Sequence, residues 1–320
     1  MIKVPRKKIP VYVLQETPSP YKQQRRASSS FLRQALSEIF DLFPIRKVSG
    51  TTVLVKPNLL KAGDPLCVTP GDMILETAAL LKDGGARVVI GDSPAFGNAQ
   101  KVLNSLGILK RLKDMDAKVC SLKKPVPMEL PCGIKMKISK TALEADTVVN
   151  IPRLKAHCQM GITSAVKNTF GTVVGFRKAL AHTLYGGDRE LFSAMILDIS
   201  KLFPNSINIV DARTVMHVTG PSGGLPFSTG IVAASPSAVA VDTCLYQILG
   251  LRPETVPLWK RALEQKVPGC EMEELYFPKR DYKEIYLKER PLMPQSLEPL
   301  TFNPFRFLRG RIRSLMSRVF

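Results

Sequence analysis

The segment from residue 150 to residue 178 holds the side chains best suited to chemistry. Arg153, Lys155 and His157 stand at alternate positions. An extended backbone would therefore place all three on one face of the chain. Two cations beside an imidazole are suited to holding an anionic group next to a proton donor or acceptor.

Lys167 and Asn168 continue this segment, on a helix expected to begin near residues 161–163. Free N–H groups at a helix N-terminus attract anions, and a nearby lysine adds a charge-assisted hydrogen bond. The combined pattern predicts a site for a phosphate or a carboxylate.

A solvated cationic face is the alternative interpretation of the same residues in this basic chain. Gly161, Gly171 and Gly175 favour the binding site, because glycine costs stability on a plain helix surface unless the backbone needs its freedom.

The chain has three histidines, His157, His182 and His217. Neutral imidazole serves as a general acid or base near pH 7. We therefore predict His157 and His182 as catalytic, with a purely structural role as the alternative for each. No HxxxH or HExxH pattern is present, so no metal site is predicted, and the sequence names no cofactor.

Polar side chains follow several predicted buried strands. The strands expected at residues 51–55 and 87–90 are followed by Lys56, Asn58 and Asp92. Ligands of parallel sheets bind beyond the carboxyl ends of the strands. Asp92 is therefore predicted as a catalytic carboxylate, and the predicted binding residues are Lys56, Asn58, Arg153, Lys155, Lys167 and Asn168.

Two further carboxylates are candidates. Asp211 is expected to end the strand at residues 205–211, and we predict that it orients a histidine or accepts a proton. Asp242 lies in an apolar stretch, where a buried carboxylate needs a partner; capping of backbone N–H groups is the simpler interpretation.

The periodicity predicts an α/β fold with a mostly parallel sheet built from βαβ units and flanked by helices. Helices are expected at residues 31–43, 73–81, 99–113 and 239–250. The predicted parts of the chain are a basic segment at 1–8, an α/β core at 9–262, an extension with a Pro-rich linker at 263–300, and a basic amphipathic tail helix at 301–320.

The net charge of +19 is concentrated at the two ends of the chain. Residues 1–26 contain seven Lys or Arg against one acid, and residues 301–320 contain five Arg and no acid. Apolar side chains recur at helical spacing in residues 305–320, which predicts attachment to an anionic membrane surface, with packing on protein as the alternative. Nucleic acid is an unlikely partner, because stacking aromatics are sparse near the basic N-terminal residues.

The six cysteines form no CxxC pair and indicate reduced thiols. No secretory signal and no run of about 18 apolar residues is present, so we predict a cytoplasmic protein whose membrane contact would be peripheral, at the inner face. One alternative is a redox accessory protein that binds iron–sulfur or metal through Cys67, Cys158 or Cys244 with histidines.

A series of short motifs occurs in one order along the chain. They are VLVKPNLL at 53–60, GDSP at 91–94, NIPRLKAH at 150–157, AVKNTFG at 165–171, GPSGG at 220–224 and AVD at 240–242. As a set they resemble the bacterial and archaeal family called domain of unknown function 362, over roughly residues 10–262.

The resemblance implies an α/β fold but no settled reaction. Many members of that family carry a ferredoxin-like segment with clustered cysteines, and this chain lacks it. The usual Lys-Thr-His triplet stands here as Lys155–Ala156–His157, without the hydroxyl. The usual Pro-Lys before it is Pro152–Arg153, which keeps the positive charge.

The leading hypothesis is an enzyme that binds a phosphorylated or carboxylated small molecule in a cationic site at the strand ends, presented at the membrane. The redox accessory protein and a non-catalytic membrane-surface adaptor are the two alternatives. Neither the substrate nor the reaction can be deduced from the sequence.

Overall fold

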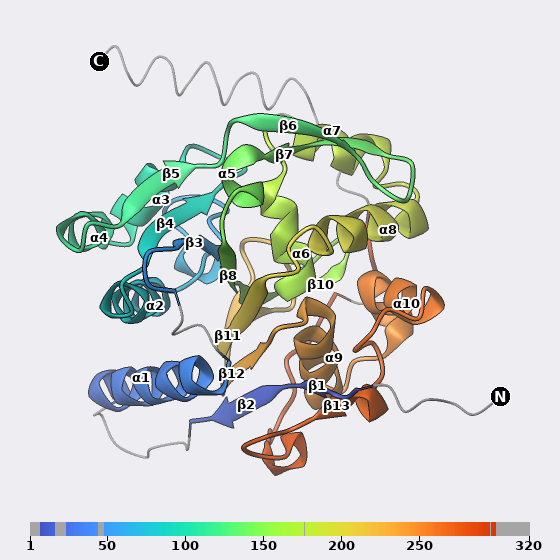
Figure 1. The fold of residues 1–320 in the computed structure, drawn as a ribbon. Coiled ribbons are helices and arrows are strands. Elements are labelled where there is room, and N and C mark those ends of the chain that lie inside the picture. The colour runs from blue at the N-terminus through green and yellow to red at the C-terminus, as the bar shows by residue number, and fades with distance from the viewer. Residues whose placement is uncertain (1–6, 17–23, 44–47, 176, 295, 299–320) are drawn as a thin grey trace.

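The computed structural model describes residues 7–16, 24–43, 48–175, 177–294 and 296–298. Helices cover both faces of a central sheet, as Figure 1 shows, so the architecture is the predicted α/β arrangement. Successive apolar side chains of a strand point to opposite faces of the sheet, so they pack against a helix layer on either side.

The main sheet has nine strands within the described residues. Its path runs β10-β9-β11-β8-β3-β4-β5, and β12 pairs with β11 and with β2. The run β11-β8-β3-β4-β5 is parallel, whereas β12, β2 and β10 are antiparallel to their neighbours. The strands are β2 (Tyr12–Gln15), β3 (Thr52–Pro57), β4 (Arg87–Asp92), β5 (Lys118–Ser121), β8 (Thr147–Ile151), β9 (Arg153–His157), β10 (Gly161–Thr163), β11 (Ser206–His217) and β12 (Leu225–Ser235).

Strands β8 and β9 form one continuous path that is interrupted only at Pro152. Both pair in parallel with β11, first β8 and then β9, and the carbonyl of Pro152 accepts the N–H of Asp211 at 2.9 Å. Strand β9 therefore extends beyond the carboxyl end of β3, whose last residue pairs with Ile151. This geometry projects the polar face of β9 past the edge of the parallel sheet.

Two helix layers enclose the sheet. Val53 and Val55 share an apolar cluster with helices α1 and α2, whereas Leu54 packs with α6, α8 and α10 on the opposite face. The helices are α1 (Gln24–Leu42), α2 (Gly71–Asp83), α3 (Ala99–Ser105), α4 (Leu109–Asp114), α5 (Lys140–Leu143), α6 (Ala165–Thr169), α7 (Arg177–Leu184), α8 (Arg189–Ser200), α9 (Ala238–Ile248) and α10 (Pro257–Glu264).

Three local predictions are wrong. Residues 99–113 form two helices, because Gly107 adopts a left-handed conformation (φ 70°) between α3 and α4. Residues 161–163 are strand β10, which pairs with β9, and the helix begins only at Ala165. Asp211 lies in the interior of β11, because that strand continues to His217 along a second partner.

The segment after α10 returns to the body of the protein. Short strand β13 (Leu275–Tyr276) pairs with β1 (Ile9–Pro10), and the small antiparallel pair β6 (Pro125–Glu129) and β7 (Lys135–Ser139) lies outside the main sheet. The predicted tail helix at 301–320 lies outside the described residues. Within the described part of the chain, no helix combines the length and apolar character needed to cross a bilayer.

Candidate functional site

Three polar side chains occupy one row across the centre of the sheet. Lys56 of β3 is in register with Asn150 of β8, which is in register with Asn208 of β11. All three are almost fully buried. Buried polar groups need hydrogen-bond partners. Asn150 donates to Asn208 within the row, whereas Lys56 donates to Asp92 and to the carbonyl of Pro57.

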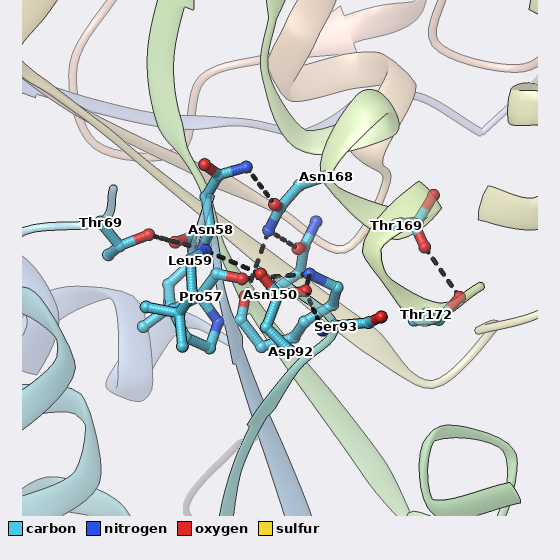
Figure 2. A network of polar contacts seen from close by, with 12 residues as sticks. Pro57, Asn58, Leu59, Thr69, Asp92, Ser93, Asn150, Asn168, Thr169 and Thr172 are labelled. Carbon is cyan, nitrogen blue, oxygen red and sulfur yellow. Dashed lines mark hydrogen bonds and ion pairs between the residues drawn. The ribbon is translucent and has the colours of Figure 1, made fainter. Parts of the chain in front are cut away.

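A chain of four asparagine amides crosses this row, and Figure 2 shows three of its members. Asn58 donates from Nδ2 to Asn168 Oδ1 at 3.0 Å, and Asn168 donates from Nδ2 to Asn150 Oδ1 at 2.7 Å. Asn150 in turn donates to Asn208 Oδ1 at 2.8 Å. Lys155 Nζ stands at the head of the chain and donates to Asn58 Oδ1 at 2.7 Å. Each amide therefore fixes the orientation of the next.

Asp92, at the end of β4, is paired rather than free. Its Oδ1 accepts Lys56 Nζ at 2.9 Å and the Ser93 N–H at 2.8 Å, and its Oδ2 accepts the Leu59 N–H at 2.7 Å. Gly171 lies against this pair, and an added Cβ would come within 3.0 Å of both Asp92 Oδ1 and Lys56 Nζ. Only glycine fits there without moving the ion pair.

Three more lysines lie around this core. Lys155 Nζ also donates to Cys67 O at 2.6 Å, and Lys178 of α7 donates to Ser93 O. Lys167 Nζ lies 4.5 Å from the ring centroid of Phe170 and 5.7 Å from that of Phe192. Within the described residues, Lys167 forms no hydrogen bond or ion pair, so its contacts are cation–π contacts alone.

The two predicted catalytic histidines lie together. The rings of His157 and His182 are stacked, with centroids 6.2 Å apart and planes 11° from parallel. His182 Nδ1 lies 2.6 Å from Gln159 Oε1, while Gln159 Nε2 donates to Gly186 O at 3.2 Å. An amide oxygen only accepts, so His182 carries its proton on Nδ1 and has its lone pair on Nε2.

His157 has the opposite tautomer. Its Nδ1 accepts the backbone N–H of Gln159 at 3.2 Å, so the neutral ring carries its proton on Nε2. Gln159 thus orients both rings. His157 is left as a donor at Nε2, and His182 is left as an acceptor at Nε2.

We call the six residues Lys56, Lys155, His157, Lys167, Lys178 and His182 the lysine–histidine cluster. Burial lowers the pKa of Lys155 to about 8 and that of Lys178 to about 8. Burial, followed by the charges of Lys178 and Lys155, lowers the pKa of Lys167 to about 7. Burial and the neighbouring lysines hold the pKa of both histidines well below its ordinary value. The cluster is thus short of negative charge.

A cavity of about 170 Å³ meets the polar row at Lys56 and Asn150. It lies between the row, the end of α8 and the start of α9, where Ser200 and Ser237 line it. His157, His182 and Lys167 are not part of its lining. His157 and Lys167 are buried, whereas His182 and Lys178 are partly exposed.

The other predicted site residues have structural partners. The Arg153 guanidinium donates to the carbonyls of Thr214, Pro65 and Val68. Asp211 is fully buried and accepts from Arg213, whose other partner is Asp72. No contact joins Asp92 or Asp211 to either histidine among the described residues.

Asp242 has the capping role expected of a buried carboxylate. Its two oxygens accept the N–H groups of Ala165 and Val166, at 2.8 and 3.0 Å, at the start of α6. Burial raises the pKa of Asp242 to about 6.

The cysteines do not form a cluster. None of the six is part of a disulfide, and Cys67, Cys244 and Cys270 are buried. Within the described residues, no group of three or more His, Cys, Asp or Glu side chains could hold a metal ion. The geometry provides no argument for the redox alternative.

Four members of the site were not among the predicted site residues: Asn150, Gln159, Lys178 and Asn208. Asn150 carries the same signal as Asn58 and Asp92, a polar residue at the end of a buried strand, so it could have been found. Gln159 lies in the turn between β9 and β10, and no spacing rule distinguishes it from an ordinary loop glutamine.

A family model for a domain of unknown function, DUF362, matches residues 53–247. This range contains all six residues of the lysine–histidine cluster. The chain belongs to the DUF362 family. It is also 33% identical over 272 residues to a thylakoid-associated protein from Synechocystis sp., a match that covers 84% of each chain.

Two solved structures were also found. The lactate racemase apoprotein from Thermoanaerobacterium thermosaccharolyticum aligns at a TM-score of 0.47 and 14% identity, over 74% of this chain and 57% of that one. A structural-genomics protein from Thermotoga maritima aligns at a TM-score of 0.45 and 10% identity, over 66% of this chain and 56% of that one. The chain thus spans a little more than half the length of either.

Proposed function

We propose that this DUF362 protein is an enzyme that binds a phosphorylated or carboxylated small molecule at the lysine–histidine cluster. The observation that carries the proposal is the charge imbalance there. Four lysines lie around the site, and among the described residues only Lys56 has a carboxylate partner.

Burying an unpaired cation is costly, and proteins rarely do so without a compensating anion. Lys155 is 1% exposed and Lys167 is 7% exposed. A bound phosphate or carboxylate would supply the missing negative charge and would favour the protonated form of each lysine. The same ligand would stabilise the folded protein through linkage.

The two histidines would perform the chemistry. His157 offers an N–H donor at Nε2 and His182 offers a lone pair at Nε2, which is the arrangement needed for one hydrogen-bond donor and one general base. The depressed pKa values keep both rings neutral near pH 7, so these roles would be available at physiological pH. The predicted catalytic parts of Asp92 and Asp211 have no support from a contact to either ring.

Access to the buried His157 and Lys167 would be widened by a movement of α7, the helix that contributes Lys178 and His182. Glycines lie on both sides of it, at Gly175 and at Gly186–Gly187. Gly175 has a positive φ of 74°. Small residues at element ends commonly act as hinges for closing segments.

Calorimetric titration with inorganic phosphate and with oxalate tests the proposal. Lys155→Met should weaken binding by about tenfold or more, because a charge-assisted hydrogen bond is lost. Lys260→Met, on the exposed face of α10, is the matched control and should bind as the wild type does. Equal affinity of the wild type and Lys155→Met, with both folded by circular dichroism, would reject the proposal.

The proposal includes action at a membrane surface. The relative from Synechocystis is named as thylakoid-associated, and residues 305–320 of this chain have the basic, amphipathic pattern of a surface-bound segment. Anionic lipid would attract the arginines of this tail.

Flotation with vesicles tests this part separately. The protein should float with phosphatidylglycerol-containing vesicles and not with pure phosphatidylcholine. The double variant Arg309→Glu, Arg313→Glu should lose this binding and keep oxalate affinity. Unchanged flotation of the double variant would show that residues 305–320 do not attach the protein to anionic lipid.

A further inference from the structure

Lys167 differs from the other lysines of the cluster in its surroundings. Lys56 is held by Asp92, Lys155 by two oxygens, and Lys178 by a backbone carbonyl. Lys167 has two aromatic rings instead, with no acceptor for its N–H groups among the described residues. Its charged form is stabilised by these ring contacts alone, without a carboxylate or a carbonyl oxygen among the described residues.

The neighbours of Lys167 also favour a neutral amine. Lys178 and Lys155 repel its positive charge. The rings of Phe170 and Phe192, which Lys167 contacts, also lie against His182, with centroids 5.5 and 5.0 Å from that of the imidazole. A lysine in an apolar pocket next to other cations is the environment that turns its amine into a nucleophile.

We infer that Lys167 is a catalytic nucleophile that forms a Schiff base with a carbonyl compound carrying a carboxylate or phosphate. The inference rests on the proposed anion site, because Lys155 and Lys178 would hold the anionic group while Lys167 reaches the carbonyl. The substrate class is thus narrowed to oxo acids and phosphorylated aldehydes or ketones.

The reaction balances with the groups present. The Lys167 nitrogen lone pair attacks the carbonyl carbon, the C–N bond forms, and the C=O π electrons move to oxygen. His157 Nε2–H would hydrogen-bond this oxygen, while His182 Nε2 takes each amine proton in turn and passes it to the oxygen. The C–O bond then breaks, C=N forms, and the oxygen leaves as water with both former amine hydrogens.

Reductive trapping with glyoxylate tests the inference. Full-length protein is incubated at pH 7 with glyoxylate and sodium cyanoborohydride, which reduces the imine and leaves a carboxymethyl group on the lysine. Peptide mass spectrometry then compares labelling rates of Lys167 and exposed Lys260. Lys167 should react on the order of tenfold faster or more, because a larger fraction of its amine is neutral, and inorganic phosphate should slow it.

The variant Lys167→Arg separates the two proposals, because it keeps a cation but cannot form an imine. It should lose the adduct at this position, and the oxalate affinity of the wild type then distinguishes the two proposals. If the wild type binds oxalate and Lys167 still reacts no faster than Lys260, the Schiff-base inference is overturned and the anion site stands. If the wild type does not bind oxalate, the proposed function fails, and the inference fails with it.

Discussion

The two histidines of the site are distinguished by one glutamine. Gln159 accepts from His182 through its side chain and donates to His157 through its backbone. The rings are nearly parallel and chemically alike, yet each is held in a different tautomer. The assignment of acid and base therefore depends on this residue of the β9–β10 turn.

Nitrogen NMR of histidine-labelled protein should report this difference directly. His157 and His217 both accept a backbone N–H at Nδ1, so we expect their protons on Nε2. His182 should alone carry its proton on Nδ1. In Gln159→Leu, the His182 signal should move toward a mixture of tautomers, while His217 serves as the internal control. An Nε2–H form of His182 in the wild type would contradict the acid–base assignment.

At the scale of elements, much of the site could be predicted from where strands end. Lys56, Asn58 and Asp92 lie at or just after the ends of short buried strands, and parallel strands bring such residues to one edge. The alternation of Arg153, Lys155 and His157 correctly predicted an extended segment with one polar face, because the period of two is local. Leu154 and Ala156 lie on the opposite face and are fully buried.

The parts of the fold that were predicted wrongly depend on pairing between strands that are distant in the sequence. Residues 161–163 read as a helix start because glycine and threonine precede a helix, but their pairing with β9 makes them a strand. Asp211 was expected to end the strand at residues 205–211. In the structure β11 gains β9 as a second parallel partner and continues, so Asp211 is buried beside Arg213. Long-range pairing of this kind leaves no periodic signal.

The position of α7 depends on a close approach at Gly186. A Cβ there would overlap the carbonyl of His182 and Gln159 Nε2. Gly186→Ala should therefore displace α7 from the β9–β10 turn, with a loss of about 1–3 kcal/mol of stability and about tenfold or more in oxalate affinity.

Gly187→Ala is the matched control for this substitution, because nothing lies within 4 Å of its added Cβ. Chemical denaturation and oxalate titration of both variants are the measurements. Equal oxalate affinity in Gly186→Ala and Gly187→Ala would show that α7 does not determine the geometry of the site.

At the scale of the whole molecule, the buried lysines should make stability depend on pH. The pKa of Lys155, Lys167 and Lys178 is lowered on folding, so the unfolded chain binds more protons above about pH 7. The free energy of unfolding should then rise with pH. Below about pH 6.5 the two histidines add to the same trend, because they charge more readily when unfolded.

Urea unfolding between pH 6.5 and 8.5 measures this effect. Desolvation raises the pKa of the buried Cys67 thiol and of the half-buried Cys158 thiol. These thiols make stability fall as pH rises further, so the measurements end at about pH 8.5. Lys167 should contribute about 1–2 kcal/mol of the rise between pH 7 and 8.5, and Lys167→Met should lose that part of the slope. An identical slope in this variant and in Lys260→Met would mean that Lys167 is not held with a lowered pKa.

The lysine–histidine cluster is proposed to bury a cation, Lys167, that has no anionic partner until a phosphate or carboxylate binds. Thermal unfolding of Lys167→Met at pH 7, with and without inorganic phosphate, tests this most directly. The variant loses cation–π contacts of about 0.5–2 kcal/mol. It also removes the unfavourable burial of a charged amine, which is the larger effect. The same burial lowers the pKa of Lys167 to about 7.

We therefore expect Lys167→Met to be more stable than the wild type and to bind phosphate more weakly. Without phosphate, Lys167→Met should be more stable by about 1 kcal/mol or more, which raises Tm by about 2–4 °C per kcal/mol. With phosphate, the wild type and Lys260→Met should gain stability and Lys167→Met should gain little. A variant that melts below the wild type and still responds fully to phosphate would contradict the account.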